Sequence, residues 1–131
     1  MPRAYVVGNG KTLLGLDRFG QVRDFYFPYV GHEDHVRGHY LHKLGVFADG
    51  RISWFDEDSN WNIKVESEDE ALASRIIARN ESIGVALIFK DLVYNESPIF
   101  IRKVEVENLS QRSREIKVFF AHQFEMFKLH G

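Results

Sequence analysis

Residues 43–55, K-L-G-V-F-A-D-G-R-I-S-W-F, contain one of the strongest secondary-structure signals in the chain. Asp49 and Gly50 make a favourable two-residue β-hairpin turn, because aspartate and glycine both tolerate a positive φ. The turn is flanked by Lys43–Ala48 and Arg51–Phe55, which are rich in apolar residues. The segment therefore predicts two antiparallel strands joined by a tight turn.

A second β-hairpin is predicted upstream, over residues 12–27. Its strands are Thr12–Asp17 and Val22–Phe27, and the turn between them contains Gly20, which can adopt a positive φ. Pro28 follows the second strand, and proline has no N–H to donate to a sheet. The chain is therefore expected to leave the sheet at Pro28.

Further strands are predicted downstream of residue 55. Trp61–Glu66 alternates apolar and polar residues, as expected of a half-buried strand, and an acidic turn follows from Ser67 to Glu70. Ile83–Tyr94 is apolar on both sides and is expected to be covered on both faces. Ile99–Glu107 is another predicted strand. One face of the last predicted strand carries a row of apolar residues with period two: Ile116, Val118, Phe120, Phe124 and Met126.

The pattern as a whole predicts an all-β protein, an antiparallel β-sandwich formed by residues 1–131 as a single domain. No segment combines a sustained 3.6-residue apolar period with caps at both ends, so little or no helix is expected. Residues 69–79 are the part that would best tolerate a helical turn.

The composition excludes several classes of protein. The net charge is −2, from 17 basic and 19 acidic residues, and no run of Lys or Arg predicts a nucleic-acid partner. The absence of cysteine excludes disulfides and fits a reducing compartment. No stretch predicts a signal peptide or a membrane span, so we expect a soluble, cytoplasmic protein with no membrane partner.

The polar segment after Pro28 is the main candidate for a site. On a helix its histidines would gather on one face and indicate zinc, but Gly31 and Gly38 argue against a helix. A metal-binding β-domain that uses this loop is an alternative, whereas hydrogen bonds to turn carbonyls are the more common role of such histidines. The histidines have the spacing H-x2-H-x3-H-x2-H: His32, His35, His39 and His42.

No catalytic residue is predicted. Glycoside hydrolysis needs two carboxylates across a sugar ring, but residues 56–58 are expected in a solvated turn. Glu33 and Asp34 are adjacent on a loop and point apart, with no opposing carboxylate to be named. The serines lack a G-x-S-x-G nucleophile elbow. Exposed aromatic residues, such as Trp54 and Trp61, could stack on sugars, although core packing is their more common role. No cofactor is predicted.

Six blocks of sequence carry a resemblance when they are taken in order: G-N-G-K-T-L-L-G-L-D-R-F-G-Q-V (8–22), F-P-Y-V-G-H-E-D-H-V (27–36), H-K-L-G-V-F-A-D-G (42–50), S-W-F-D (53–56), I-R-K-V-E-V-E-N (101–108) and F-F-A-H-Q-F (119–124). Together they resemble the N-terminal domain of bacterial and archaeal glucoamylases of glycoside hydrolase family 15. The resemblance covers nearly the whole chain, and the order and spacing of the blocks make it more specific than any block alone.

The resemblance implies an antiparallel β-supersandwich that precedes an (α/α)6 barrel, which in this family holds both catalytic glutamates. The full enzymes are glucan 1,4-alpha-glucosidases that release glucose from the non-reducing ends of α-1,4-glucans with inversion. No residue of this chain matches a catalytic glutamate. Asp34 departs from the family pattern, which typically has asparagine there, and the chain is shorter than the family's sandwich domain. The implied role is therefore a non-catalytic domain that supports and docks the barrel.

In such an enzyme the polar loop is expected to form a rim or docking element, made of Tyr29, His32, Glu33, Asp34, His35, Arg37 and His39. The expected partner is the catalytic barrel, in the same or a separate chain, and an oligosaccharide is a further candidate partner. A stand-alone carbohydrate-binding module is the other alternative. A shortened sandwich would expose its inner rows, Val85/Leu87/Phe89 and Ile116/Val118/Phe120/Phe124. Either the two sheets close on each other, or the chain self-associates through an exposed sheet face or a free strand edge.

Overall fold

The computed structural model describes residues 5–9, 12–26, 42–68, 73–94, 96 and 99–122. Every regular element in these ranges is a β-strand, which confirms the all-β prediction. The strands are β1 (Tyr5–Gly8), β2 (Leu13–Leu16), β3 (Val22–Tyr26), β4 (Lys43–Ala48), β5 (Arg51–Trp54), β6 (Asn62–Glu68), β7 (Ala73–Asn80), β8 (Val85–Val93), β9 (Phe100–Asn108) and β10 (Ile116–Ala121). This part of the chain includes no helix able to cross a membrane.

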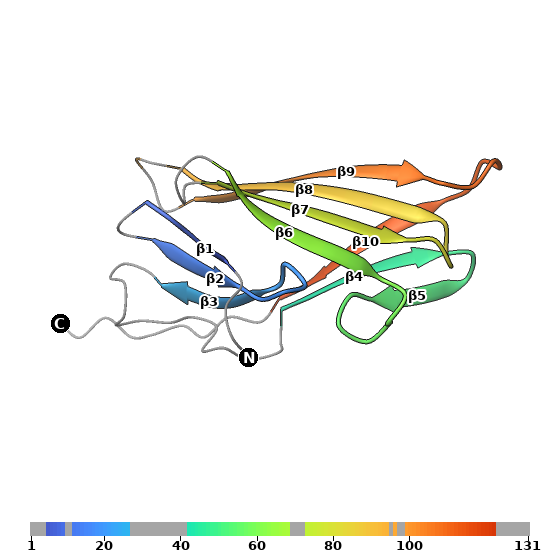
Figure 1. Cartoon of the computed structure of the whole chain (residues 1–131), viewed down its shortest axis with the longest axis horizontal. Helices are drawn as coiled ribbons and strands as arrows, with labels where there is room; N and C mark the ends of the chain where they lie inside the picture. Colours follow the sequence, from blue (N-terminus) through green and yellow to red (C-terminus); the bar gives the residue numbers. More distant parts are fainter. Residues whose placement is uncertain are drawn as a thin grey trace.

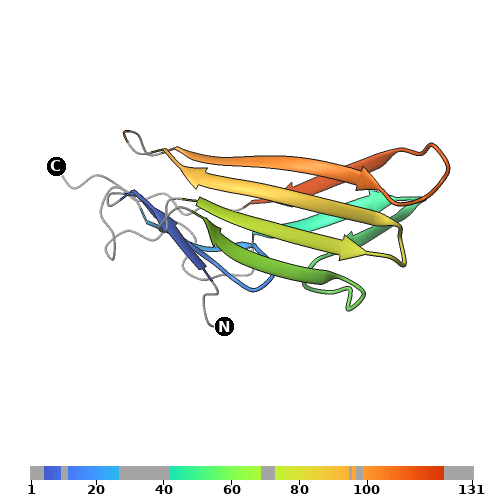
Figure 2. The same cartoon turned by 45° about the horizontal axis from the view of Figure 1, so that its top comes forward.

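The strands form three antiparallel sheets in two layers. Sheet A has the order β1-β2-β3, sheet B the order β10-β4-β5, and sheet C the order β6-β7-β8-β9. Sheet C runs along the length of the molecule and forms one layer (Figure 1). Sheets A and B lie next to each other in the opposite layer, as both views show (Figures 1 and 2). The arrangement is a β-sandwich in which one layer is divided.

The hydrophobic core lies between the two layers. On β8, Val85, Leu87 and Phe89 are fully buried, so the layers close over this inner row. Phe89 makes an edge-to-face contact with Phe55, with ring centroids 5.9 Å apart. The second inner row is less well covered, because Phe120 of β10 remains 38% exposed. The first of the two expected outcomes was that the two sheets close on each other. The inner row of β8 is covered in this way, whereas the inner row of β10 is only partly covered.

Three sequence-based expectations need correction. The coverage of Ile83–Tyr94 on both faces was wrong for the later part of β8, because its outer face is buried at Ala86 and half-buried at Ile88 but exposed at Lys90 and Leu92. The turn expected over Ser67–Glu70 is wrong at Ser67 and Glu68, which belong to β6, and its other two residues lie outside the described part of the chain. A helical turn within 69–79 is wrong from Ala73 onwards, where β7 begins. In β7 buried residues alternate with half-buried or exposed ones, which is a strand pattern.

The two predicted turns are confirmed. Asp49 and Gly50 have φ values of 53° and 77°, and β4 and β5 pair on either side of them. Gly20 has a φ of 74° between β2 and β3. This second turn is fixed by Asp17, whose carboxylate accepts hydrogen bonds from the backbone N–H groups of Phe19 and Gln21 at 2.9 and 3.0 Å.

Buried polar side chains connect the sheets. Asp17 pairs with Arg23 at 2.6 Å, and neither side chain is exposed. Gln21 extends from the same turn, and its Oε1 accepts a hydrogen bond of 2.9 Å from the backbone N–H of Leu44. This bond joins the turn of sheet A to β4 of sheet B. It therefore fixes the relative position of the strands on either side of residues 27–41.

Candidate functional site

The predicted rim loop lies outside the described residues. This applies to every residue assigned to it: Tyr29, His32, Glu33, Asp34, His35, Arg37 and His39. The described flanks of that segment are Tyr26 at the end of β3 and His42 immediately before β4.

A cavity of about 280 Å³ lies beside both flanks. It is bounded by strands of all three sheets, namely β3, β9 and β10, and by the residue that precedes β4. Most of its walls are apolar or aromatic, with three nitrogen-bearing side chains among them. We call it the His42 cavity, and its lining residues are Val22, Phe25, His42, Phe100, Arg102, Phe120 and His122.

Two histidines that are far apart in sequence meet in the His42 cavity. The Nδ1 atoms of His42 and His122 are 2.9 Å apart, and the His42 side chain is almost completely buried. A hydrogen bond between two Nδ1 atoms needs one donor and one acceptor, so the accepting imidazole is neutral. Burial lowers the pKa of His122, and the positive charge of Arg102 acts in the same direction. The rings of Phe120 and His122 are stacked, with their centroids 6.2 Å apart.

The histidine pair does not by itself make a metal site. It offers two ligands, whereas protein zinc sites have at least three protein ligands. The described residues contain no group of three or more His, Cys, Asp or Glu side chains that could hold an ion. The described residues therefore offer no third ligand for the metal-binding alternative. Three of the four histidines on which that alternative rests lie outside the described residues.

Arg102 lies in the His42 cavity but is already engaged by other groups. Its Nε and Nη2 atoms each donate to a carboxylate oxygen of Asp91 at 2.8 Å, and Nη2 also donates to the Gly20 carbonyl at 2.9 Å. Its guanidinium carbon is 5.3 Å from the ring centre of Phe89 and equally far from that of Phe100. Sequence analysis did not identify this pair. The signal that could have found this pair is the period-two alternation of the two strands, which places Asp91 of β8 and Arg102 of β9 on their inner faces.

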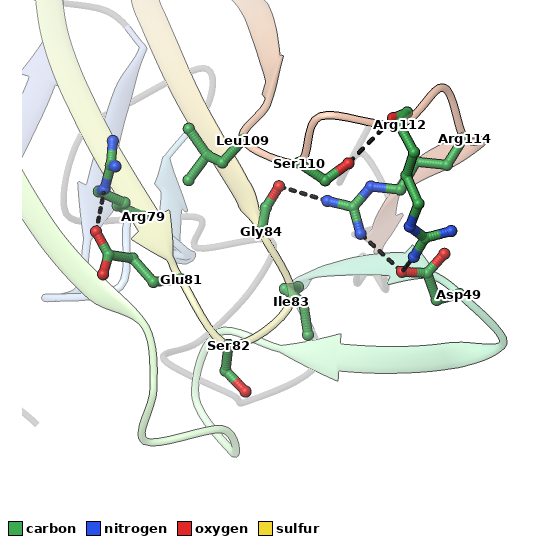
Figure 3. A pocket seen from close by; sticks show the side chains of 10 residues that line it. All are labelled: Asp49, Arg79, Glu81, Ser82, Ile83, Gly84, Leu109, Ser110, Arg112 and Arg114. Carbon is green, nitrogen blue, oxygen red and sulfur yellow. Dashed lines mark hydrogen bonds and ion pairs between the residues drawn. The ribbon is translucent and has the colours of Figure 1, made fainter.

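A second pocket, of about 450 Å³, lies at the end of the sandwich where three connections meet (Figure 3). Asp49 accepts hydrogen bonds from Arg112 at 2.5 Å and from Arg114 at 2.8 Å. The bond from Arg114 is the largest of the effects that lower the pKa of Asp49. None of the described residues that line this pocket is an aromatic on which a sugar could stack. Its lining residues are Asp49, Arg79, Glu81, Ser82, Ile83, Gly84, Leu109, Ser110, Arg112 and Arg114.

The acidic turn at residues 56–58 has a structural role at Asp58. This carboxylate accepts hydrogen bonds from Ser53 Oγ at 2.5 Å and from Asn80 Nδ2 at 3.2 Å. These bonds and that from the N–H of Asn60 lower the pKa of Asp58. Ser53 Oγ in turn accepts a bond of 2.8 Å from the indole N–H of Trp61. Trp61 is therefore part of the core, as aromatic residues more commonly are, and is not free to stack on a sugar.

The chain is similar to a protein of Methanocaldococcus jannaschii that is named as an uncharacterized glycosyl hydrolase. The two are 27% identical over 115 residues, which make up 88% of this chain and 18% of the relative. The chain thus spans less than a fifth of the length of the relative it matches. No protein-family model matches the chain, and no solved structure matches it either. Fold and similarity together describe a β-sandwich related to part of a glycosyl hydrolase.

Proposed function

We propose that this chain is the N-terminal β-sandwich domain of a glucoamylase-like hydrolase of glycoside hydrolase family 15. It docks and supports a catalytic (α/α)6 barrel, in the same or a separate chain, and does not itself cleave glucan. The observation that carries the proposal is the extent of the similarity: 88% of this chain corresponds to 18% of a glycosyl hydrolase. The matched part is a β-sandwich, which leaves most of the relative's length for a separate catalytic unit.

The hydrogen bonds made by three aspartate carboxylates support a structural role for this chain. Asp49, Asp58 and Asp91 each accept hydrogen bonds from two or more side chains. A general acid in a glycosidase needs a raised pKa, whereas the pKa values of Asp49 and Asp58 are lowered. These groups are therefore suited to holding turns and strands together.

The flanks of the predicted rim loop support a docking role for it. Strand β3 before the loop belongs to sheet A and strand β4 after it belongs to sheet B. The bond between Gln21 and Leu44 fixes these two sheets to each other. The segment assigned to the rim therefore connects two strands whose relative position is fixed. Tyr29, Glu33 and His35 are the residues that we assign to this contact.

The proposal is tested by finding the barrel and measuring its docking. The same reading frame or an adjoining gene is expected to encode an (α/α)6 barrel with two suitably placed glutamates. Glu33→Ala and His35→Ala should then weaken the association with that barrel, or lower its thermal stability where the two are one chain. Glu115→Ala, a carboxylate before β10 whose side chain is 75% exposed, is the control and should change neither. Unchanged docking in both loop variants would contradict the assignment.

A stand-alone carbohydrate-binding module is the alternative function, and it makes a different prediction. Isothermal titration calorimetry with maltooligosaccharides should give saturable heat for a binding module. Under our proposal the isolated chain gives none, because the sugar subsites belong to the barrel. Saturable binding that is lost in the loop variants would favour the alternative.

A further inference from the structure

Strand β9 is an exposed edge of sheet C. Among the described strands it is hydrogen-bonded to β8 alone, and it is nine residues long. Its Ile101 and Val106 side chains, on opposite faces, are 44% and 48% exposed. Long edge strands with exposed apolar side chains readily pair with another strand, and natural proteins usually protect them. The β9 edge is therefore a surface on which a further strand can pair.

A row of positive charges ends at this edge. The strand register places Arg75 of β7 opposite Lys90 of β8, and Lys90 opposite Lys103 of β9. Like charges in directly opposite positions destabilise a sheet. Glu105 of β9 forms ion pairs with both lysines, 3.6 Å from Lys90 and 3.7 Å from Lys103, so a single carboxylate is shared between two positive charges. A negative charge directly opposite Lys103 on its free side would complete the row.

We propose that β9 pairs with β9 of a second copy of this chain, antiparallel, about a two-fold axis at Val104. In this register Lys103 of each copy is directly opposite Glu105 of the other. The two-fold axis therefore creates two opposite-charge pairs, and each one extends the row of positive charges with a carboxylate. Directly opposed residues in an antiparallel pair lie on the same face of the sheet, so these side chains meet. Sheet C of the two copies becomes one continuous sheet.

The inner side of the same edge also favours a second copy. Val106 points toward the opposite layer but is 48% exposed, and Phe120 of the adjacent β10 is 38% exposed. Phe120 lines the same cavity as Phe100 and Arg102 of β9, which places it beside this edge. A second sandwich on the β9 side covers these apolar groups. The inference goes beyond the proposed function, and neither depends on the other.

The opposite edge of sheet C provides a matched control. Strand β6 contains the same order of residues as β9, a lysine, a valine and a glutamate, at Lys64, Val65 and Glu66. On β6, however, Lys64 Nζ is 2.9 Å from Glu66, so the two charges already pair within the strand. Glu66 is also directly opposite Arg75. These charges are satisfied without a second copy.

The test is a charge-reversal cycle followed by sedimentation velocity at increasing protein concentration. The wild-type chain is expected to form a dimer. Lys103→Glu or Glu105→Lys replaces both attractive pairs with repulsive ones and should weaken dimerisation by about tenfold or more. The double variant Lys103→Glu/Glu105→Lys restores opposite charges in the same register and should recover the dimer. The control double variant Lys64→Glu/Glu66→Lys, and each of its single reversals, should dimerise like the wild type.

Three outcomes would overturn the proposal. If the wild-type chain stays monomeric at millimolar concentration, β9 does not pair with a second copy. The candidate partner of this edge is then another polypeptide. A dimer that the single reversals at Lys103 and Glu105 leave unchanged uses another surface. A dimer that is weakened by the β6 single reversals uses the opposite edge. Circular dichroism confirms that each variant is folded, which is expected because the four altered side chains are exposed or half-exposed.

Discussion

Arg102 and Asp91 form a two-point ion pair across β9 and β8, with Nε 2.8 Å from Oδ1 and Nη2 2.8 Å from Oδ2. The Asp91 side chain is fully buried and that of Arg102 is 10% exposed. Because Nη2 also donates to the carbonyl of Gly20, a single arginine connects sheet C to a turn of sheet A. The pair fixes the distance between the two layers beside the His42 cavity.

Removing one member of this pair is expected to destabilise the fold strongly. Arg102→Met leaves the Asp91 carboxylate buried without its counter-charge, which typically costs about 3–5 kcal/mol. The change is measured as the free energy of unfolding in urea. The control is Arg79→Met, because Arg79 and Glu81 pair at the surface with side chains 50% and 78% exposed. That pair should contribute less than about 1 kcal/mol. Equal losses in the two variants would show that Arg102 is not a connection between layers.

Gly20 and Gly50 are expected to differ in their tolerance of alanine. Both have a positive φ, which costs an L-residue about 1–2 kcal/mol. At Gly50 an added Cβ meets no atom within 4 Å. At Gly20 it would lie 2.5 Å from Cδ1 of Ile76, a fully buried side chain with little room to move.

Gly20→Ala should therefore cost about 1–3 kcal/mol more than Gly50→Ala, because it adds overpacking to the backbone strain. Thermal or urea denaturation of the two variants measures this difference directly. If the two losses were the same, the close packing of the β2–β3 turn against β7 would be contradicted.

The imidazole of His122 is expected to make stability depend on pH. Burial and the charge of Arg102 lower its pKa from the ordinary value of 6.5. The unfolded chain therefore binds this proton at a higher pH than the folded chain does. The stabilisation by neutral His122 is complete above about pH 6.5, and it is lost as the pH falls from there through the folded-state pKa. The effect is modest because His122 is still partly exposed.

This dependence is measured by urea unfolding at pH 7.5, 6.5 and 5.5. Wild type should lose more stability between the first and last of these values than His122→Gln does. The variant keeps a polar side chain at this position but has no group that titrates in the range. Parallel curves for the two proteins would mean that His122 has the same pKa in the folded and unfolded chain.

The strands and turns were well predicted because their signals are local. Lys43–Ala48 has the same bounds in the sequence-based prediction and in β4, since Asp49 and Gly50 determine where the strand ends. The outer face of β8 was predicted wrongly at Lys90 and Leu92 for a related reason. Apolar residues such as Ile88 and Leu92 indicate coverage, but only the opposing layer decides which face is covered.

The polar contacts between distant residues could not be predicted in this way. His42 and His122 are 80 residues apart, and Gln21 and Leu44 belong to different sheets. Each contact depends on how the sheets pack, and the alternation pattern of a single strand does not contain that information. His122 occupies the polar position in the period-two row that includes Phe120 and Phe124, but this pattern does not indicate which residue it contacts.

The central claim, a non-catalytic domain of a glucoamylase-like hydrolase, is tested most directly by glucose release. The purified chain is incubated with maltooligosaccharides, and free glucose is measured enzymatically over time, with an intact glucoamylase as the positive control. Our account predicts no glucose above the buffer blank. Sustained release that increases with the concentration of the chain, and that is lost in Glu33→Ala, would contradict it.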